Sequence, residues 1–157
     1  MRVGIGYDVH PLMAGRPLVL GGVTVPFVSG LCGHSDADVL THAIIDAILG
    51  AAALKDIGSH FPDTDPQYKD ISSITLLNRV GDMLHNGGFK IENIDATVLC
   101  EQPRLGDYID KMRSNIGAAL DIDIEHVSVK ATTSAGLGFL GEGMGIATHA
   151  VALVKKQ

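Results

Sequence analysis

Three side chains of the kinds that bind metal ions, Asp8, His10 and His42, lie near the start of this 157-residue chain. In residues 2–10 the apolar side chains fall on alternate positions, which predicts a β-strand with one buried face. Asp8 and His10 share the opposite face of that strand. One aspartate and two histidines match the three protein ligands of a catalytic zinc site, in which a fourth position stays open for substrate or water.

The third of these ligands would come from a helix. Residues 36–54 are mostly apolar, and Ser35 with Asp38 three residues later resembles a capping box at a helix start. His34 and Ser35 stand just before that start, where free backbone N–H groups attract anions, so both could bind a phosphate. A plain N-cap role is the alternative for Ser35.

Asp38, His42 and Asp46 follow one another at intervals of four residues, so they form one polar stripe along the predicted helix. Carboxylates one turn away on each side could orient the imidazole of a metal ligand. A core histidine that is hydrogen-bonded to those carboxylates is the structural alternative. The presence of Asp8 and His10 in the same chain favours the zinc site.

The remaining hydrophobic patterns predict one domain over residues 1–157. The expected elements are a hairpin around Gly21-Gly22, helices over residues 72–86 and 105–120, and strands over residues 94–100, 127–131 and 146–154. Together with the first strand and helix, this order predicts an α/β (α+β) fold with a mixed β-sheet and helices packed on one face.

Residues 55–71 contain two prolines and no periodicity, so they predict a long loop of the kind that often covers a binding site. Asp56, Asp63 and Asp65 in this loop could bind substrate hydroxyl groups or a hard divalent cation. The run Asp-Thr-Asp-Pro is equally an ordinary turn sequence, and the turn is the alternative interpretation.

The composition of the chain argues against nucleic acids and membranes as binding partners. A formal net charge of −6 argues against binding to a nucleic-acid backbone, which requires a basic surface. No run of about 18 apolar residues is present, so no membrane span is expected. Cys32 and Cys100 belong to no disulfide or metal motif, and no leader precedes the first predicted strand. We therefore expect a reduced, cytoplasmic protein from a bacterium.

A phosphorylated substrate would meet few cationic side chains, because the chain has only 12 Lys and Arg residues. Metal ions, backbone N–H groups and hydroxyl groups would have to hold it instead. Thr132 and Thr133 directly follow a predicted strand, and consecutive hydroxyls at such a junction can bind phosphate oxygens. The ordinary preference of threonine for strands is the alternative explanation.

Five blocks of the sequence, taken in order, closely resemble the family of 2-C-methyl-D-erythritol 2,4-cyclodiphosphate synthases, the cyclising enzymes of the non-mevalonate isoprenoid pathway. They are residues 6–10, 33–47, 56–58, 61–65 and 130–133. The resemblance covers the whole chain, and its first two blocks are the most specific.

The resemblance implies a homotrimer with active sites between subunits, each holding Zn²⁺ or another divalent metal through Asp8, His10 and His42. The substrate would be 4-diphosphocytidyl-2-C-methyl-D-erythritol 2-phosphate, whose 2-phosphate attacks the β-phosphorus and expels CMP. A second ion, Mg²⁺ or Mn²⁺, would bridge the diphosphate. Such a reaction depends on holding two ends of one molecule together and neutralising the charge that develops.

The resemblance also implies roles for individual residues. His34 and Thr133 would stabilise the transition state, and the stretch around Arg104 would form the cytidine pocket of a neighbouring subunit. The residues expected to contact the substrate are Asp8, His10, His34, Ser35, Asp46, Asp56, Ile57, Gly58, Phe61, Asp63, Asp65, Cys100, Pro103, Arg104, Leu105, Gly106, Ala131, Thr132, Thr133 and Phe139.

Two positions depart from the family pattern. Ala135 stands where many members have a glutamate that contacts magnesium, so the second metal would rely on phosphates, water or a nearby aspartate. Glu142 stands where many members have an arginine that binds anions near the trimer axis. We expect this charge reversal to prevent the retention of isoprenoid diphosphates there.

Two other functions remain as alternatives. In a zinc-dependent phosphohydrolase, water would occupy the open metal position and the product would be acyclic. In a zinc-stapled trimeric module, a metabolite would bind without turnover. The second alternative is disfavoured, because a structural zinc usually has four protein ligands and only three are evident.

Overall fold

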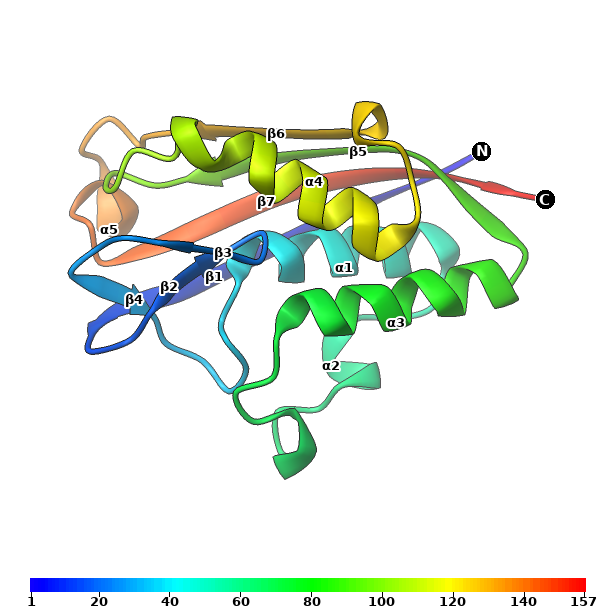
Figure 1. The fold of residues 1–157 in the computed structure, drawn as a ribbon, viewed down its shortest axis with the longest axis horizontal. Helices are drawn as coiled ribbons and strands as arrows, with labels where there is room; N and C mark the ends of the chain where they lie inside the picture. Colours follow the sequence, from blue (N-terminus) through cyan, green and yellow to red (C-terminus); the bar gives the residue numbers. More distant parts are fainter.

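Two long antiparallel strands, β1 (Arg2–Ala14) and β7 (Gly145–Lys156), run through the middle of the protein in a computed structural model that describes residues 1–157 (Figure 1). They belong to a five-stranded sheet with the order β4-β1-β7-β5-β6. The pair β5 and β6 is parallel and the other pairs are antiparallel. The sheet is therefore mixed, as the sequence predicts.

The other elements follow in short succession. The remaining strands are β2 (Leu18–Leu20), β3 (Val23–Val25), β4 (Ser29–Leu31), β5 (Phe89–Leu99) and β6 (Val127–Thr132); the helices are α1 (Val39–Ala52), α2 (Ile57–His60), α3 (Ser73–Asn86), α4 (Ile109–Leu120) and α5 (Gly138–Gly141). Strands β2 and β3 form the predicted hairpin around Gly21-Gly22. No helix is both long and apolar enough to cross a membrane.

Helix α1 is buried nearly all round, between the sheet on one side and α3 on the other (Figure 1). Two glycines of β1 allow the helix to approach this closely. A Cβ atom added to Gly6 would lie 1.9 Å from the carbonyl oxygen of Ala43, and one added to Gly4 would lie 2.1 Å from that of Ala47. The backbone of α1 thus lies directly against the strand that carries Asp8 and His10.

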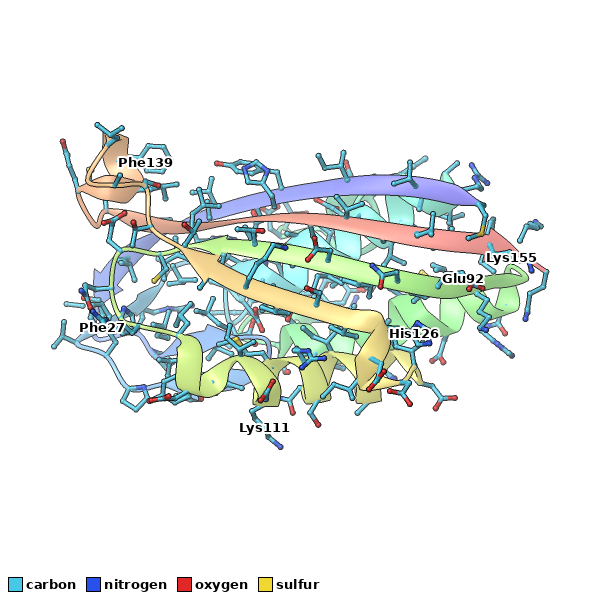
Figure 2. The ribbon with its side chains drawn as sticks, turned by 90° about the horizontal axis from the view of Figure 1, so that it is seen from above. Phe27, Glu92, Lys111, His126, Phe139 and Lys155 are labelled. Carbon is cyan, nitrogen blue, oxygen red and sulfur yellow. The ribbon has the colours of Figure 1, made fainter.

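The apolar face of β1 is not the buried one, which corrects the expectation for residues 2–10. Val3 is 68% exposed and Ile5 is 72% exposed, whereas Gly6 on the other face is buried. The reason is that the helices cover the glycine face, while Figure 2 shows the outer side of the sheet with no helix over it. The alternating pattern predicts the strand correctly, but the face that it predicts to be buried is the exposed one.

The start of α1 also differs from the prediction. Asp38, rather than Ser35, is the N-cap, and its side chain accepts a hydrogen bond from the backbone N–H of Thr41. Ala37 has a positive φ of 58°, so the backbone there is not helical. The predicted helix over residues 36–54 is therefore real but begins at Val39.

Candidate metal and substrate site

The structure brings Asp8, His10 and His42 together, and their possible ligand atoms all lie within 4.8 Å of one another. Oδ2 of Asp8 lies 2.9 Å from Nε2 of His10 and 3.1 Å from Nδ1 of His42. Two of the side chains come from β1 and the third from α1. One carboxylate and two imidazoles at this spacing form a donor set suited to a divalent metal ion.

The ring of His10 is held in an orientation that suits metal binding. Its Nδ1 atom lies 2.9 Å from the carbonyl oxygen of Cys32. Since a carbonyl oxygen can only accept, Nδ1 carries a hydrogen and donates it. Nε2 is then the atom that faces the cluster, which is the arrangement in which outer hydrogen bonds fix metal-binding histidines.

Without a metal ion, the cluster behaves as an ion pair. Burial acts to raise the pKa of Asp8, but hydrogen bonds and charge interactions with His10 and His42 outweigh it and lower the pKa to about 2. Burial acts to lower the pKa of His10, but its contacts with Asp8 and with the Cys32 carbonyl raise it above the ordinary value. The carboxylate is thus ready to bind a cation at neutral pH.

The predicted polar stripe does not surround His42. The Asp38 carboxylate is fully buried and accepts from the backbone N–H groups of Gly21, Gly22 and Thr41. Asp46 accepts from the N–H of Ile57 at 2.8 Å. Both carboxylates accept from backbone N–H groups, and neither is hydrogen-bonded to the imidazole of His42.

Two serine hydroxyls, rather than carboxylates, lie within hydrogen-bond distance of the His42 imidazole. Nε2 of His42 lies 2.8 Å from Oγ of Ser73 and 3.1 Å from Oγ of Ser35. Ser73 is fully buried at the start of α3, 31 residues after His42. Ser73 is not among the predicted site residues, because no local sequence pattern distinguishes a first-turn serine that contacts another helix.

A cavity of about 430 Å³ opens beside the cluster. Nine residues predicted for the site line it, namely Asp8, His10, His34, Ser35, His42, Ile57, Gly58, Phe61 and Asp63. Gly33, Pro62, Tyr68 and Leu76 also line the cavity and were not predicted. The three candidate metal ligands, the loop before α1 and the segment after α1 therefore form one concave site.

Two of the loop carboxylates instead hold turns. Asp56 caps α2 by accepting from the N–H of Ser59, and Asp65 accepts from the N–H of Gln67. These hydrogen bonds, together with those from the Ser59 and Gln67 side chains, lower the pKa of both carboxyl groups. Neither residue lines the cavity. For Asp65, this placement agrees with the alternative interpretation of the run Asp-Thr-Asp-Pro as a turn.

The residues predicted for a cytidine pocket line a second cavity, of about 480 Å³, at the ends of β5 and β6. It contains Cys100, Pro103, Arg104, Leu105, Gly106, Ala131, Thr132 and Thr133, as well as Glu101, Gln102 and Ile109. Burial raises the pKa of the Cys100 thiol to about 11, so this cysteine is protonated at neutral pH. Phe139 lies in α5, is 51% exposed and does not line this cavity.

The two cavities lie apart within one chain. Asp8 is in β1 and Thr132 is in β6, with β7 and β5 between them. Since neighbouring strands are about 4.8 Å apart, the two strands are about 14 Å apart along the sheet. The residues of the two cavities therefore lie at different places along the sheet of one chain.

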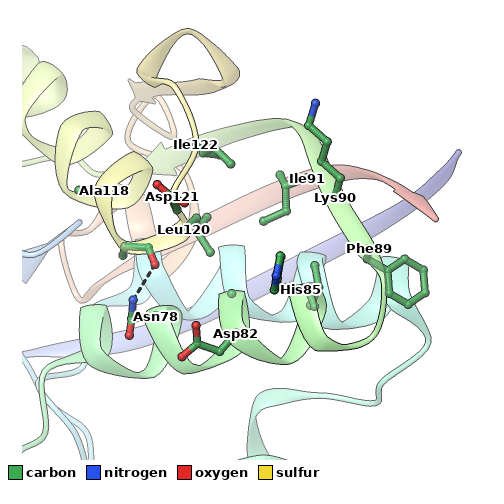
Figure 3. Close-up of a pocket in the computed structure, with 13 residues that line it drawn as sticks. Asn78, Asp82, His85, Phe89, Lys90, Ile91, Ala118, Leu120, Asp121 and Ile122 are labelled. Carbon is green, nitrogen blue, oxygen red and sulfur yellow. Dashed lines mark hydrogen bonds between the residues drawn. The ribbon is translucent and has the colours of Figure 1, made fainter. Parts of the chain in front are cut away.

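A third cavity, between the C-terminal ends of α3 and α4, contains none of the predicted residues (Figure 3). Asn78, Asp82, His85 and Asp121 are among the side chains that line it. Asn78 donates a hydrogen bond to the carbonyl oxygen of Ala119 across its edge. No group of three metal-binding side chains lies there, in contrast to the cavity beside Asp8.

Comparison with known proteins gives a consistent picture. The model of the YgbB family matches residues 1–155 of the chain. The chain is similar to a 2-C-methyl-D-erythritol 2,4-cyclodiphosphate synthase from Alkaliphilus oremlandii, at 57% identity over 156 residues that cover 99% of both proteins.

Solved structures agree. The bifunctional IspDF from Campylobacter jejuni matches with a TM-score of 0.95 and 44% identity, over 99% of this chain and 42% of that one. IspF from Plasmodium falciparum, solved as a CDP complex, matches with a TM-score of 0.87 and 31% identity, over 99% of this chain and 96% of that one.

Proposed function

The chain belongs to the YgbB family, and we propose that it converts 4-diphosphocytidyl-2-C-methyl-D-erythritol 2-phosphate to 2-C-methyl-D-erythritol 2,4-cyclodiphosphate and CMP. An oxygen of the 2-phosphate forms a bond to the β-phosphorus, and the bond from that phosphorus to the bridging oxygen breaks, so that CMP leaves. The enzyme is a cyclising phosphorus–oxygen lyase, and residues 1–157 form its single catalytic domain. The convergence of Asp8, His10 and His42 beside a cavity carries this proposal.

The donor set supports a divalent metal ion, Zn²⁺ in our proposal, held by these three side chains. When bound, such an ion acts as a Lewis acid on a phosphate oxygen and leaves one position for the substrate. A second ion, Mg²⁺ or Mn²⁺, would be held by the substrate diphosphate. The chain itself offers few other positive charges to the phosphates, with Arg104 the one cationic side chain lining the second cavity.

The residues around the first cavity suit the sugar-phosphate part of the substrate. His34 donates from Nε2 to the carbonyl oxygen of Asp65 at 3.0 Å, which positions its ring between the metal ligands and the loop. Ser35 contributes a hydroxyl at the cavity wall, and Gly58 leaves space at its edge. We assign His34 and Thr133 to stabilising the charge on the reacting phosphates.

The separation of the two cavities supports a homotrimer whose active sites lie between subunits. The cytidine end of the substrate would bind around Arg104 and Thr132 of one subunit, and its methylerythritol end beside Asp8 of the next. The exposed apolar side chains of Val3 and Ile5, on the side of the sheet without helices, supply a surface that such an assembly would bury.

The test is to incubate the protein with 4-diphosphocytidyl-2-C-methyl-D-erythritol 2-phosphate and to follow the products by phosphorus NMR. The reaction is run with Zn²⁺ and Mg²⁺ present, again after the metals have been removed by a chelator, and again with the variant His42→Ala. His85→Ala, in the third cavity, is the matched control for loss of a histidine. We expect metal-dependent CMP and a cyclic diphosphate from the wild type and the control, and neither from His42→Ala. CMP with an acyclic product would indicate a phosphohydrolase, and binding without turnover would indicate a metabolite-binding module.

A further inference from the structure

We propose that Ser73, held by Asp36, is a positioning residue for His42. It accepts the hydrogen on Nε2 of the imidazole, so that Nδ1, which faces Asp8, is the nitrogen whose hydrogen a bound metal ion would replace. This inference rests on the metal site of the proposed function. It adds two residues, one in the loop before α1 and one in α3, that neither line the cavity nor ligate the metal themselves.

The direction of the hydrogen bonds follows from a count of hydrogens. Oγ of Ser73 is within hydrogen-bond distance of a carboxylate oxygen of Asp36 and lies 2.8 Å from Nε2 of His42. A serine hydroxyl has one hydrogen, and a carboxylate can only accept. The hydrogen of Ser73 therefore points to Asp36, and its oxygen must accept from Nε2 of His42.

Asp36 is well placed to enforce this direction. Besides the Ser73 hydroxyl, its carboxylate accepts from the backbone N–H of Ser73 at 3.0 Å and from that of Asp38 at 3.2 Å. Its own backbone N–H donates to the carbonyl oxygen of Ile71 at 3.1 Å. These bonds hold Ser73 and the end of the loop after α2 against the segment that precedes α1.

With Nε2 used as a donor to Ser73, only Nδ1 of a neutral His42 can provide a lone pair. This atom is the one that faces Asp8, at 3.1 Å from Oδ2. In His10 the roles of the two nitrogens are exchanged: Nδ1 donates to the carbonyl oxygen of Cys32, and Nε2 faces Asp8. Each histidine of the site therefore has one outer partner that selects its ligand atom.

Ser35 is a weaker candidate for the same role. Its Oγ atom lies 3.1 Å from Nε2 of His42 and also accepts from the backbone N–H of Ala37. No contact uses its hydroxyl hydrogen, and the residue lines the cavity. Ser35 is thus free to donate to a substrate oxygen, while Ser73 holds the ring.

The test is the zinc affinity of the metal-free protein, measured by competition with a chromophoric chelator. We expect Ser73→Ala to weaken zinc binding by about 10- to 100-fold, the usual effect of removing an outer partner of a metal-binding histidine. Thr41→Val is the matched control, because it removes a buried hydroxyl that donates to the Asp38 carboxylate in the same helix. Its zinc affinity should stay within about twofold of the wild type, since Thr41 does not act on the imidazole.

A second readout reports on the hydrogen bond itself. In the zinc-loaded wild type, nitrogen NMR should show His42 protonated at Nε2 with a slowly exchanging hydrogen, and Ser73→Ala should make that exchange faster. Equal zinc affinities for wild type and Ser73→Ala, or an equal loss in Thr41→Val, would overturn the inference. A wild type that binds no zinc would instead refute the metal site of the proposed function.

Discussion

Oδ2 of Asp8 lies 3.1 Å from Nδ1 of His42, although the two residues are 34 positions apart in the sequence. The contact exists because α1 lies directly on β1, and Gly4 and Gly6 carry no side chain to keep it away. The spacing of Asp8 and His10 along the strand is local, but the approach of His42 depends on this helix–strand contact. The close approach of the three candidate metal ligands therefore depends on the two glycines.

We expect Gly6→Ala to destabilise the protein by about 3 kcal/mol, at the upper end of typical overpacking effects. The added Cβ would lie 1.9 Å from the carbonyl oxygen of Ala43, and a backbone atom cannot move aside without shifting α1. Zinc affinity should fall with stability, because the same shift displaces His42. Denaturant unfolding and zinc competition measure the two effects.

Gly50→Ala is the control for this substitution. Gly50 lies in α1, the helix that packs on Gly6, and outside its own helix the added Cβ would meet only the carbonyl oxygen of Ile5, at 4.0 Å. We expect Gly50→Ala to be neutral or stabilising by up to about 1 kcal/mol through helix propensity. Equal destabilisation by the two substitutions would contradict the explanation.

The metal-free protein should show a pH window of extra stability from the Asp8–His10 contact. The pKa of Asp8 is lowered from 3.8 to about 2, so its contribution is present above pH 3.8 and is lost as the pH falls through 2. The pKa of His10 is raised above 6.5, so its contribution is present below pH 6.5 and is lost as the pH rises through the raised value. Both contributions are therefore complete between about pH 4 and 6.5.

Comparing the unfolding free energy of metal-free wild type and Asp8→Asn between pH 3 and 8 tests this window. We expect the difference to be greatest near pH 5, on the order of 2 kcal/mol from the shift of Asp8, and to shrink toward both ends. A difference that does not change with pH would show that the carboxylate does not interact with the histidines through charge.

The exposed side of the sheet leads to a prediction about assembly. We expect Ile5→Asp to convert the proposed trimer into monomers, because Ile5 is 72% exposed on the side of the sheet without helices and a charge buried there by assembly would be unpaired. Activity should disappear while the circular dichroism spectrum stays unchanged. Light scattering after size-exclusion chromatography measures the mass.

Lys111→Asp, on the outer side of α4, serves as the control for a new surface aspartate (Figure 2). It should leave both the mass and the activity unchanged. A fully active Ile5→Asp monomer would refute the interpretation that the two cavities come from different subunits.

The sequence predicts the fold and the site correctly where they are determined by residues close together in the chain. The period of two in β1 places Asp8 and His10 on one face, and the hydrophobic patterns locate α1, α3 and α4 to within a few residues. The same period cannot tell which face a helix covers. The small residues Gly4 and Gly6 were the available signal, because only they permit contact at the distance of a backbone.

The remaining features depend on backbone conformation and on contacts between distant segments, neither of which residue types reveal. Ser35 was preferred to Asp38 as the N-cap because the positive φ of Ala37 is not evident from residue types. Ser73 was missed because its importance comes from a histidine 31 positions earlier. A hydroxyl that accepts from a ligand histidine looks, in sequence, like any serine at a helix start.

A substitution at Ala135 tests how the proposed second metal ion is held. Ala135 is exposed beside the second cavity, and its backbone N–H lies 3.3 Å from Oγ1 of Thr133, so a longer side chain here would reach the region proposed for the diphosphate. Alanine has no atom that can bind a cation. We expect Ala135→Glu to reduce the magnesium concentration needed for half-maximal activity several-fold, because a carboxylate adds a hard oxygen ligand.

Ala135→Gln is the matched control, since it has the same length without the charge and should change the magnesium titration little. Both variants retain the left-handed backbone of Ala135, which has a φ of 55°, so any strain is shared between them. Identical magnesium titrations for the wild type and Ala135→Glu would mean that the substrate phosphates and water hold the second ion without help from this loop.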